Sequence, residues 1–131
     1  MAQSGRPSAP KPKIAFVVDD ERIIAKTLAL ILNHAGFDAH TFFDGQDAVD
    51  SLDTLQPDLL ITDVVMPGLN GVEVAIITRT KIPKCKILLF SGQAATTDLL
   101  DTARAQGHAE LEILAKPIHP TDLLAKIRSQ P

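Results

Sequence analysis

Polar residues that could bind a metal ion and a phosphoryl group follow four short apolar runs of this sequence. The stretch FVVDDE, Phe16 to Glu21, ends in three carboxylates, and a second run ends at Asp63. LLFSG carries a hydroxyl at Ser91, and LAKP carries an amine at Lys116. Clustered carboxylates repel one another, so they either take up protons or bind a cation. An all-oxygen cluster suits magnesium, and with a lysine beside it the set suits phosphoryl transfer.

These polar residues meet only if the apolar runs are strands of one sheet. Short apolar runs alternate with longer amphipathic stretches, which is typical of repeated strand and helix units. Most of the runs are nearly continuous in apolar character, as strands covered on both faces are. We therefore predict an α/β fold, a doubly wound and mainly parallel five-stranded sheet with helices on both faces. In such folds the chemistry lies beyond the carboxyl ends of the strands.

The predicted element boundaries follow from the same pattern. The strands are Ile14–Val18, Phe37–Phe42, Asp58–Thr62, Lys86–Phe90 and Glu110–Leu114, and the helices are Arg22–His34, Asp44–Leu55, Gly71–Arg79, Ala94–Gln106 and Pro120–Arg128. The segment 37–42 alternates apolar and polar residues, which favours an edge strand. In the first helix, Ile24, Leu28, Ile31 and Ala35 recur at helical spacing and are predicted to form its buried stripe.

Composition limits the class of protein. The chain has 131 residues, of which 45% are hydrophobic, enough for the core of one domain. A net charge of −3 does not indicate a nucleic-acid or membrane-binding surface. With one cysteine, no signal-like segment and no apolar run of about 18 residues, a cytoplasmic location is expected. The proline-rich segment 1–12 is predicted to be a disordered tail, and 13–131 the folded domain.

The motifs VVDDE, TDVVMPGLNG, LLFSG and LAKP, in this order and at these spacings, resemble the response-regulator receiver domain of two-component signalling. Each motif alone is unspecific, but four in order at successive strand ends are specific. The resemblance implies the flavodoxin-like strand order 2-1-3-4-5 and covers essentially Lys13 to Ser129. It implies phosphorylation by a histidine kinase or a histidine phosphotransfer protein. The protein would therefore accept a phosphoryl group and would not be a turnover enzyme on an external substrate.

The resemblance also assigns roles to individual residues. Asp63 is expected to be the phosphoacceptor. Asp20 is expected to bind Mg²⁺ directly and Asp19 through a water molecule, and Asp63 and the backbone carbonyl of Val65 are expected to complete the protein ligands. Lys116 is expected to pair with Asp63 before the reaction and with the phosphoryl group after it.

Further expectations concern the fourth and fifth strands. Ser91 is expected to hydrogen-bond a phosphoryl oxygen, and Gly92 to leave room for the phosphoryl group. The bond between Lys116 and Pro117 is expected to be cis, as in the family. A family receiver usually carries Tyr or Phe three residues before the lysine, where this chain has Ile113.

The output is expected to leave by protein contact or phosphoryl relay, because only Arg128 to Pro131 follow Ile127. The family's signalling surface is formed by the fourth helix, the fifth strand and the fifth helix, and an unknown downstream protein is expected to bind there. The segment from Gly107 to Lys116, which includes Ile113, is also longer than the common family pattern. We therefore hypothesise that phosphorylation is retained while the output is altered.

Other interpretations remain open at this level. Asp19, Asp20 and Glu21 could cap and charge the first turn of the following helix. Asp63 could be a turn residue before MPGLNG, and Lys116 a solvated surface amine. For the whole protein, one alternative is a phosphorylation-independent interaction module on the same fold. Another is a magnesium phosphohydrolase, which the absence of a candidate general base disfavours.

Overall fold

The computed structural model describes residues 11–92, 96–107, 111–116 and 119–128. The strands are β1 (Ile14–Val18), β2 (Asp38–Phe42), β3 (Leu59–Asp63), β4 (Lys86–Ser91) and β5 (Glu112–Ala115), and the helices are α1 (Arg22–His34), α2 (Gly45–Ser51), α3 (Gly71–Lys81), α4 (Thr96–Ala105) and α5 (Pro120–Arg128). Most of the predicted tail, residues 1–10, lies outside the described residues, as does Pro117, whose bond to Lys116 was expected to be cis. The predicted order of strands and helices along the chain is therefore confirmed.

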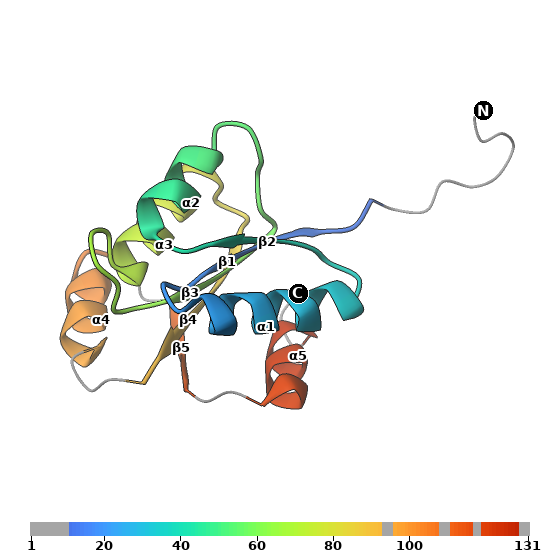
Figure 1. The fold of residues 1–131 in the computed structure, drawn as a ribbon. Coiled ribbons are helices and arrows are strands. Elements are labelled where there is room, and N and C mark those ends of the chain that lie inside the picture. Colours follow the sequence, from blue (N-terminus) through green and yellow to red (C-terminus); the bar gives the residue numbers. More distant parts are fainter. Residues whose placement is uncertain (1–10, 93–95, 108–110, 117–118, 129–131) are drawn as a thin grey trace, which may run out of the picture.

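All five strands lie parallel in one sheet, in the order β2-β1-β3-β4-β5. Figure 1 shows α1 and α5 on one face of this sheet and α2, α3 and α4 on the other. One core cluster joins the sheet to α2, α3 and α4, and the other joins it to α1 and α5. The predicted doubly wound fold, its strand order and the position of β2 at an edge are confirmed. The carboxyl ends of β1, β3 and β4 consequently lie side by side.

Several element ends differ from the predicted ones. β3 begins at Leu59 and includes Asp63, so the polar residue is the last residue of the strand itself. α2 ends at Ser51, before the predicted end at Leu55. The Ser51 hydroxyl donates to the Asp47 carbonyl, and the Thr54 hydroxyl donates to the Ser51 carbonyl. Such side-chain bonds compete with regular helical bonding, so residues 52–54 form turns instead.

The buried face of α1 lies one residue further along the helix than the predicted stripe. The buried residues are Ala25, Leu28, Ala29 and Leu32, so only Leu28 belonged to the predicted set. The small side chains of Ala25 and Ala29 allow the helix axis to approach the sheet, and the bulky isoleucines then lie beside the contact. Ile24 and Ile31 are only partly buried. α1 is therefore apolar over a wider arc than its contact with the sheet uses.

No helix in the described part of the chain is both long enough and apolar enough to cross a membrane.

Cys85 lies in the core beside α3 and is almost fully buried, at 2% exposure. Burial raises the pKa of its thiol to about 12. We expect native protein at pH 8 to react with a thiol reagent at least about 100-fold more slowly than protein in denaturant, because the thiolate is the reactive form. Mass spectrometry of alkylated protein over time measures both rates. Equal rates in the two conditions would contradict the buried position.

Candidate functional site

Three carboxylates meet where β1 and β3 end. The parallel register pairs Val18 of β1 with Thr62 of β3, so Asp19 and Asp63 follow at neighbouring positions on the same sheet edge. Asp19 is 1% exposed and Asp63 is 8% exposed, whereas Asp20 points to solvent. Carboxylate oxygens of all three residues lie within 4.8 Å of one another. The structure therefore brings together the three acidic residues that the sequence predicted to share a site.

Lys116 reaches into this cluster from the end of β5. Its backbone N–H donates to the carbonyl of Ser91 at 3.0 Å, which continues the β4–β5 pairing. Its Nζ lies 2.9 Å from Oδ2 of Asp19 and 3.2 Å from Oδ1 of Asp63. The lysine thus bridges two carboxylates and lies slightly closer to Asp19 than to Asp63. It is a partly buried ion-pair group at this site, and the surface-amine interpretation is wrong.

The environment shifts the pKa values of two groups in the cluster. Burial raises the pKa of Asp63, and repulsion from Asp19 raises it further, against a lowering by Lys116. Burial alone would lower the pKa of Lys116, but the hydrogen bond and charge of Asp19, followed by those of Asp63, outweigh it and raise that pKa. With one ammonium group among three carboxylates, the site retains an excess of negative charge. That excess favours a proton or a cation at Asp63.

This raised pKa predicts a pH dependence of stability. A carboxyl group with a higher pKa in the folded than in the unfolded state binds its proton more tightly when folded. The free energy of unfolding therefore falls as the pH rises from the ordinary pKa of a carboxyl group through the raised one. The variant Asp63→Asn lacks this fall, so its advantage over the natural chain should grow across that window and then level off.

Urea denaturation followed by circular dichroism, at a series of pH values without divalent ions, measures this difference. The chain has no Trp and no Tyr, so intrinsic fluorescence is a poor probe. A difference between variant and natural chain that stays constant across the acidic range would contradict a raised pKa at Asp63.

The backbone around Asp63 is fixed by the start of α3. The N–H of Val64 donates to the carbonyl of Phe90 at 2.9 Å, and the N–H of Gly71 donates to the carbonyl of Val64 at 2.8 Å. The helix begins with a capping box in which Asn70 and Glu73 each accept the other's backbone N–H. The loop between β3 and α3 is therefore closed at both ends by backbone bonds. Val65 lies in this loop and is 37% exposed.

Gly71 packs against the backbone of Asp63 itself. A Cβ at Gly71 would overlap the carbonyl oxygen of Asp63, so no side chain fits at this position. The sequence pattern predicted Gly71 only as the first residue of the third helix and did not indicate this contact. The available signal was a glycine at the first position of a helix, where Asn70 already supplies the cap. Gly71 is thus a positioning residue for Asp63.

Gly71→Ala should therefore shift the β3–α3 loop. We expect a loss of about 1 to 3 kcal/mol in the free energy of unfolding, because rigid backbone atoms must move. Gly68→Ala is the matched control in the same loop, since it has φ of 75° but open space where its Cβ would lie. Its effect should come from left-handed strain alone. Backbone NMR shifts at Asp63 and Val64 should move in Gly71→Ala and stay in Gly68→Ala; the reverse pattern would contradict the contact.

The remaining predicted residues lie around the cluster. Ser91 is the last residue of β4, 8% exposed, one strand away from Asp63. Gly92 is exposed, and a Cβ there would make an ordinary 3.7 Å contact with Cβ of Lys116. Ile113 is partly buried and packs on the core cluster beneath α3 and α4. Ser91 thus lies at the carboxyl-terminal edge of the sheet, as predicted. The space beside Gly92 faces the aliphatic part of the Lys116 side chain.

The helix-capping interpretation of the acidic stretch is only partly correct. Glu21 is the N-cap residue of α1, but its side chain makes no capping hydrogen bond. Oδ1 of Asp19 accepts the N–H of Glu21 at 2.9 Å, while Oδ2 of Asp19 faces Lys116. Asp19 therefore fixes the start of the helix with one oxygen and takes part in the charged cluster with the other.

The donor set suits a hard divalent cation. The three carboxylates supply only oxygen atoms, and their excess negative charge is the kind that Mg²⁺ neutralises. Asp20, being exposed, could give an oxygen to such an ion without breaking any bond described above, whereas Asp19 already uses both oxygens. The residues present therefore fit magnesium.

The sequence of this chain matches a known protein family and several curated proteins. Residues 15–128 match the family model described as the response regulator receiver domain. The DNA-binding response regulator MtrA of Mycobacterium tuberculosis (strain ATCC 25618 / H37Rv) is 31% identical over 115 residues, which are 88% of this chain and 49% of that protein. MtrA of Mycobacterium leprae (strain TN) matches to the same extent. The chain thus spans about half the length of the curated relatives it matches.

Solved structures of response regulators also superpose on this chain. Chemotaxis protein CheY4 of Vibrio cholerae superposes with a TM-score of 0.78 at 25% identity, over 90% of this chain and 98% of that one. Response regulator TrrA of Thermotoga maritima, described in complex with Mg(2+)-BeF, superposes with a TM-score of 0.74 at 30% identity, over 89% of this chain and 97% of that one.

Proposed function

The chain belongs to the response regulator receiver domain family, and from this premise we propose that it accepts a phosphoryl group on Asp63 in a magnesium-dependent reaction. Receiver domains of this family are phosphoacceptor modules of two-component signalling. The observation that carries the proposal for this chain is the bridge from Nζ of Lys116 to Asp19 and Asp63. This bridge places the partly buried amine of Lys116 beside the Asp63 carboxylate, which would react.

In the proposed reaction, an oxygen of Asp63 attacks the phosphorus atom of a phosphohistidine or a small acyl phosphate. The new bond is P–O, the broken bond is P–N or P–O of the donor, and its electron pair leaves with the donor. Oδ1 of Asp63 accepts the N–H of Val64 at 3.0 Å, which orients the carboxylate. The amine of Lys116 is within reach of the same oxygen and can follow the charge to the phosphoryl group. The hydroxyl of Ser91 is proposed to bond a phosphoryl oxygen.

Asp19, Asp20, Asp63 and the backbone carbonyl of Val65 would hold Mg²⁺. When bound, the ion supplies the neutralisation that lets one anion approach another. Asp20 is proposed as a direct ligand and Asp19 as a ligand through water, since the buried Asp19 already bonds Lys116 and the N–H of Glu21.

The donor is proposed to be a histidine kinase or a histidine phosphotransfer protein in the cytoplasm. The output is proposed to pass by protein contact or phosphoryl relay, through the surface of α4, β5 and α5. Ile113 supports an altered output, because an isoleucine that packs on the core cannot act as a rotating aromatic switch. It also favours a second candidate, a phosphorylation-independent interaction module on this fold. That module would not need to bind magnesium.

The test is phosphoryl incorporation from acetyl phosphate, followed on a phosphate-retaining gel. We expect a mobility shift that requires Mg²⁺ and disappears with a chelator. A magnesium titration followed by backbone NMR should move the amide signals near Asp19 and Asp63 first. Failure of both acetyl phosphate and a phosphohistidine donor to shift the band, together with no magnesium response, would favour the interaction module instead.

A further inference from the structure

A small hollow lined by charged side chains lies at the opposite edge of the sheet from the carboxylate cluster. Its volume is about 180 Å³, and we call it the amino-edge hollow. Lys13, Asp58, Lys84 and Lys86 line it where β1, β3 and β4 begin, and Ile127 lines it where α5 ends. The five residues of β3 separate this edge from Asp63 by about 13 Å at 3.3 Å per residue. The hollow is therefore distinct from the phosphoacceptor site.

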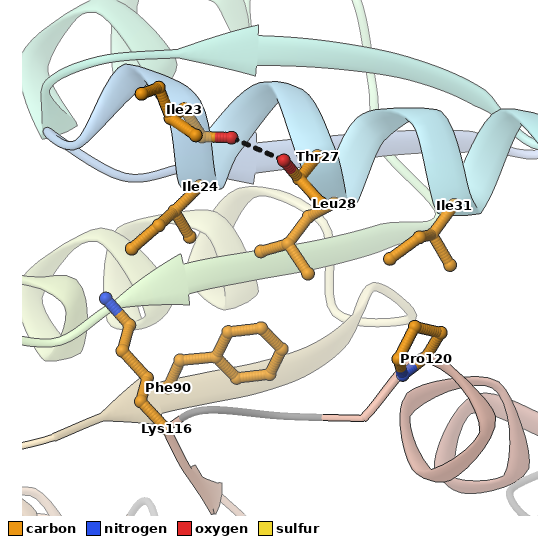
Figure 2. A pocket seen from close by; sticks show the side chains of 8 residues that line it. All are labelled: Ile23, Ile24, Thr27, Leu28, Ile31, Phe90, Lys116 and Pro120. Carbon is orange, nitrogen blue, oxygen red and sulfur yellow. Dashed lines mark hydrogen bonds between the residues drawn. The ribbon is translucent and has the colours of Figure 1, made fainter.

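A larger groove of about 500 Å³ between α1, β4 and α5 has a different character. Isoleucine and leucine side chains of α1 face Phe90 and Pro120 across it, and Lys116 lies at one end (Figure 2). This groove adjoins the carboxylate cluster through Lys116, and none of its described lining residues also lines the amino-edge hollow. The charges of the amino-edge hollow consequently have no part in the site described above.

Positive charge prevails at the amino-edge hollow. Lys13 and Lys84 are exposed, and Lys86 is partly buried. Among the described residues that line the hollow, Asp58 is the one carboxylate, and its Oδ2 accepts the N–H of Ile14 at 2.9 Å. Three ammonium groups against one carboxylate leave an excess of two positive charges.

Neighbouring groups do not cancel this excess. Asp38, at the start of β2, has its Oδ2 3.2 Å from Nε2 of His40 on the same strand. The carbonyl of Ile127 lies at the negative end of the α5 dipole, but it accepts a hydrogen bond from Nζ of Lys86 at 2.9 Å. Arg128, which is exposed and follows Ile127, adds a further positive charge at this end of the helix. The edge therefore stays positive and attracts anions.

Backbone hydrogen bonds fix the frame of the hollow. The N–H of Asp58 donates to the carbonyl of Ile14 at 2.8 Å, and the N–H of Lys86 donates to the carbonyl of Asp58 at 3.0 Å. The side chains of Asp58 and Lys86 are each held by a hydrogen bond to the backbone as well. Only the exposed side chains of Lys13 and Lys84 have to be ordered by a ligand. A site that is ordered in advance loses less entropy when it binds.

The volume and the charge of the hollow define the class of ligand. Its 180 Å³ is below the roughly 300 Å³ at which pockets for drug-sized ligands begin, so it suits a single small group. Ammonium groups are donors only, so they suit an oxyanion. A phosphate group has three acceptor oxygens and close to two negative charges near neutral pH, which matches the excess of two positive charges. Phe37, Leu59 and Ile127 add an apolar wall that a short substituent can contact.

We propose that the amino-edge hollow binds a phosphate dianion, either free phosphate or the phosphate group of a small monoester. Lys13 and Lys84 bind its oxygens from the exposed side, and Lys86 faces it from the start of β4. Because Lys86 also bonds the carbonyl of Ile127, an anion bound here reaches the end of α5. The consequence for signalling rests on the proposed output surface, of which α5 is a part, whereas the binding itself does not.

Backbone NMR of the full chain during a titration with sodium phosphate tests the proposal. The titration is made without divalent ions, at constant ionic strength and at about pH 8, where phosphate is mainly a dianion. We expect saturable shifts of the amide signals of Ile14, Asp58, Lys86 and Ile127, with a Kd of about 1 to 10 mM. Sodium acetate should bind at least about tenfold more weakly, because it carries a single charge.

Variants that each remove one positive charge locate the site. Lys13→Gln and Lys84→Gln should each weaken phosphate binding by about fivefold, because each loses a charge-assisted hydrogen bond. Lys26→Gln is the matched control, since it removes the same charge from an exposed position of α1 outside the hollow. Its Kd should equal that of the natural chain. All three side chains are exposed, so none of these substitutions disturbs the core.

Phenyl phosphate distinguishes the two sources of the ligand. Tighter binding than that of inorganic phosphate would assign the hollow to a monoester with an apolar substituent, and equal or weaker binding would assign it to free phosphate. Shifts that rise linearly to the highest concentration would overturn the proposal. Equal losses of affinity in Lys84→Gln and Lys26→Gln would overturn it as well, and so would shifts confined to the surroundings of Asp63.

The variant Asp63→Asn separates this test from the proposed function. It should bind phosphate at the amino-edge hollow as the natural chain does, although it accepts no phosphoryl group. A natural chain that is labelled by acetyl phosphate but shows no saturable phosphate shifts would overturn the inference about the hollow alone. A chain that binds phosphate at the hollow but is not labelled would count against the phosphoacceptor role alone.

Discussion

Asp63→Asn is expected to abolish phosphoryl incorporation completely, from acetyl phosphate and from a phosphohistidine donor alike. The amide has no nucleophilic carboxylate oxygen, and in the described part of the chain the only other carboxylate in an ion pair with Lys116 is that of Asp19. Asp19, the other partner of Lys116, is 1% exposed. A phosphate-retaining gel at saturating magnesium measures the loss directly.

The matched control for this change is Asp58→Asn, just before the opposite end of the same strand. Asp58 is exposed, and its Oδ2 accepts the N–H of Ile14 at 2.9 Å, a bond that an amide oxygen can keep. Incorporation should continue at the natural rate in this control. Residual incorporation in Asp63→Asn at a rate close to that of the control would place the phosphoacceptor elsewhere.

Lys116→Met is expected to have the second largest effect, on both reaction and stability. Incorporation should slow by about 100-fold or more, because a preorganised positive charge beside the reacting oxygen is lost. The free energy of unfolding at neutral pH should fall by about 3 kcal/mol, because buried Asp19 then loses its cation. Kinetics of acetyl phosphate labelling and urea denaturation measure the two effects.

Two controls separate these effects from simple loss of packing. Magnesium should stabilise Lys116→Met more than the natural chain, since a bound cation replaces the lost charge. Asp19→Asn in the Lys116→Met background should recover part of the stability, because the two residues are coupled through a 2.9 Å contact. Additive effects of the two substitutions would show that Lys116 and Asp19 do not depend on each other.

The fold was predictable because each apolar run was short, uninterrupted and followed by an amphipathic stretch. β1 and α1 have the predicted bounds, and the sheet has the predicted order. The polar residues of the site were predictable for a related reason. Parallel strands end at one edge, so Asp19, Asp63 and Ser91 had to lie near one another once the strands were identified.

Contacts that depend on packing distance were not predictable. Periodicity alone suggested Ile24 and Ile31 as buried residues of α1, whereas Ala25 and Ala29 lie on the buried face with Leu28 and Leu32. The contact of Gly71 with the carbonyl of Asp63 likewise depends on where α3 begins in space. The preference of Lys116 for Asp19 over Asp63 is a difference of 0.3 Å between its 2.9 Å and 3.2 Å contacts, which no sequence pattern encodes.

The most direct test of the central claim is chemical location of the phosphoryl group. Protein treated with acetyl phosphate and magnesium is reduced with borohydride, which converts an aspartyl phosphate to homoserine, and its peptides are sequenced by mass spectrometry. We predict homoserine at position 63 alone, and only when magnesium was present. Homoserine at another carboxylate, or none at position 63 under conditions where the gel mobility shifts, would contradict the assignment of Asp63 as the phosphoacceptor.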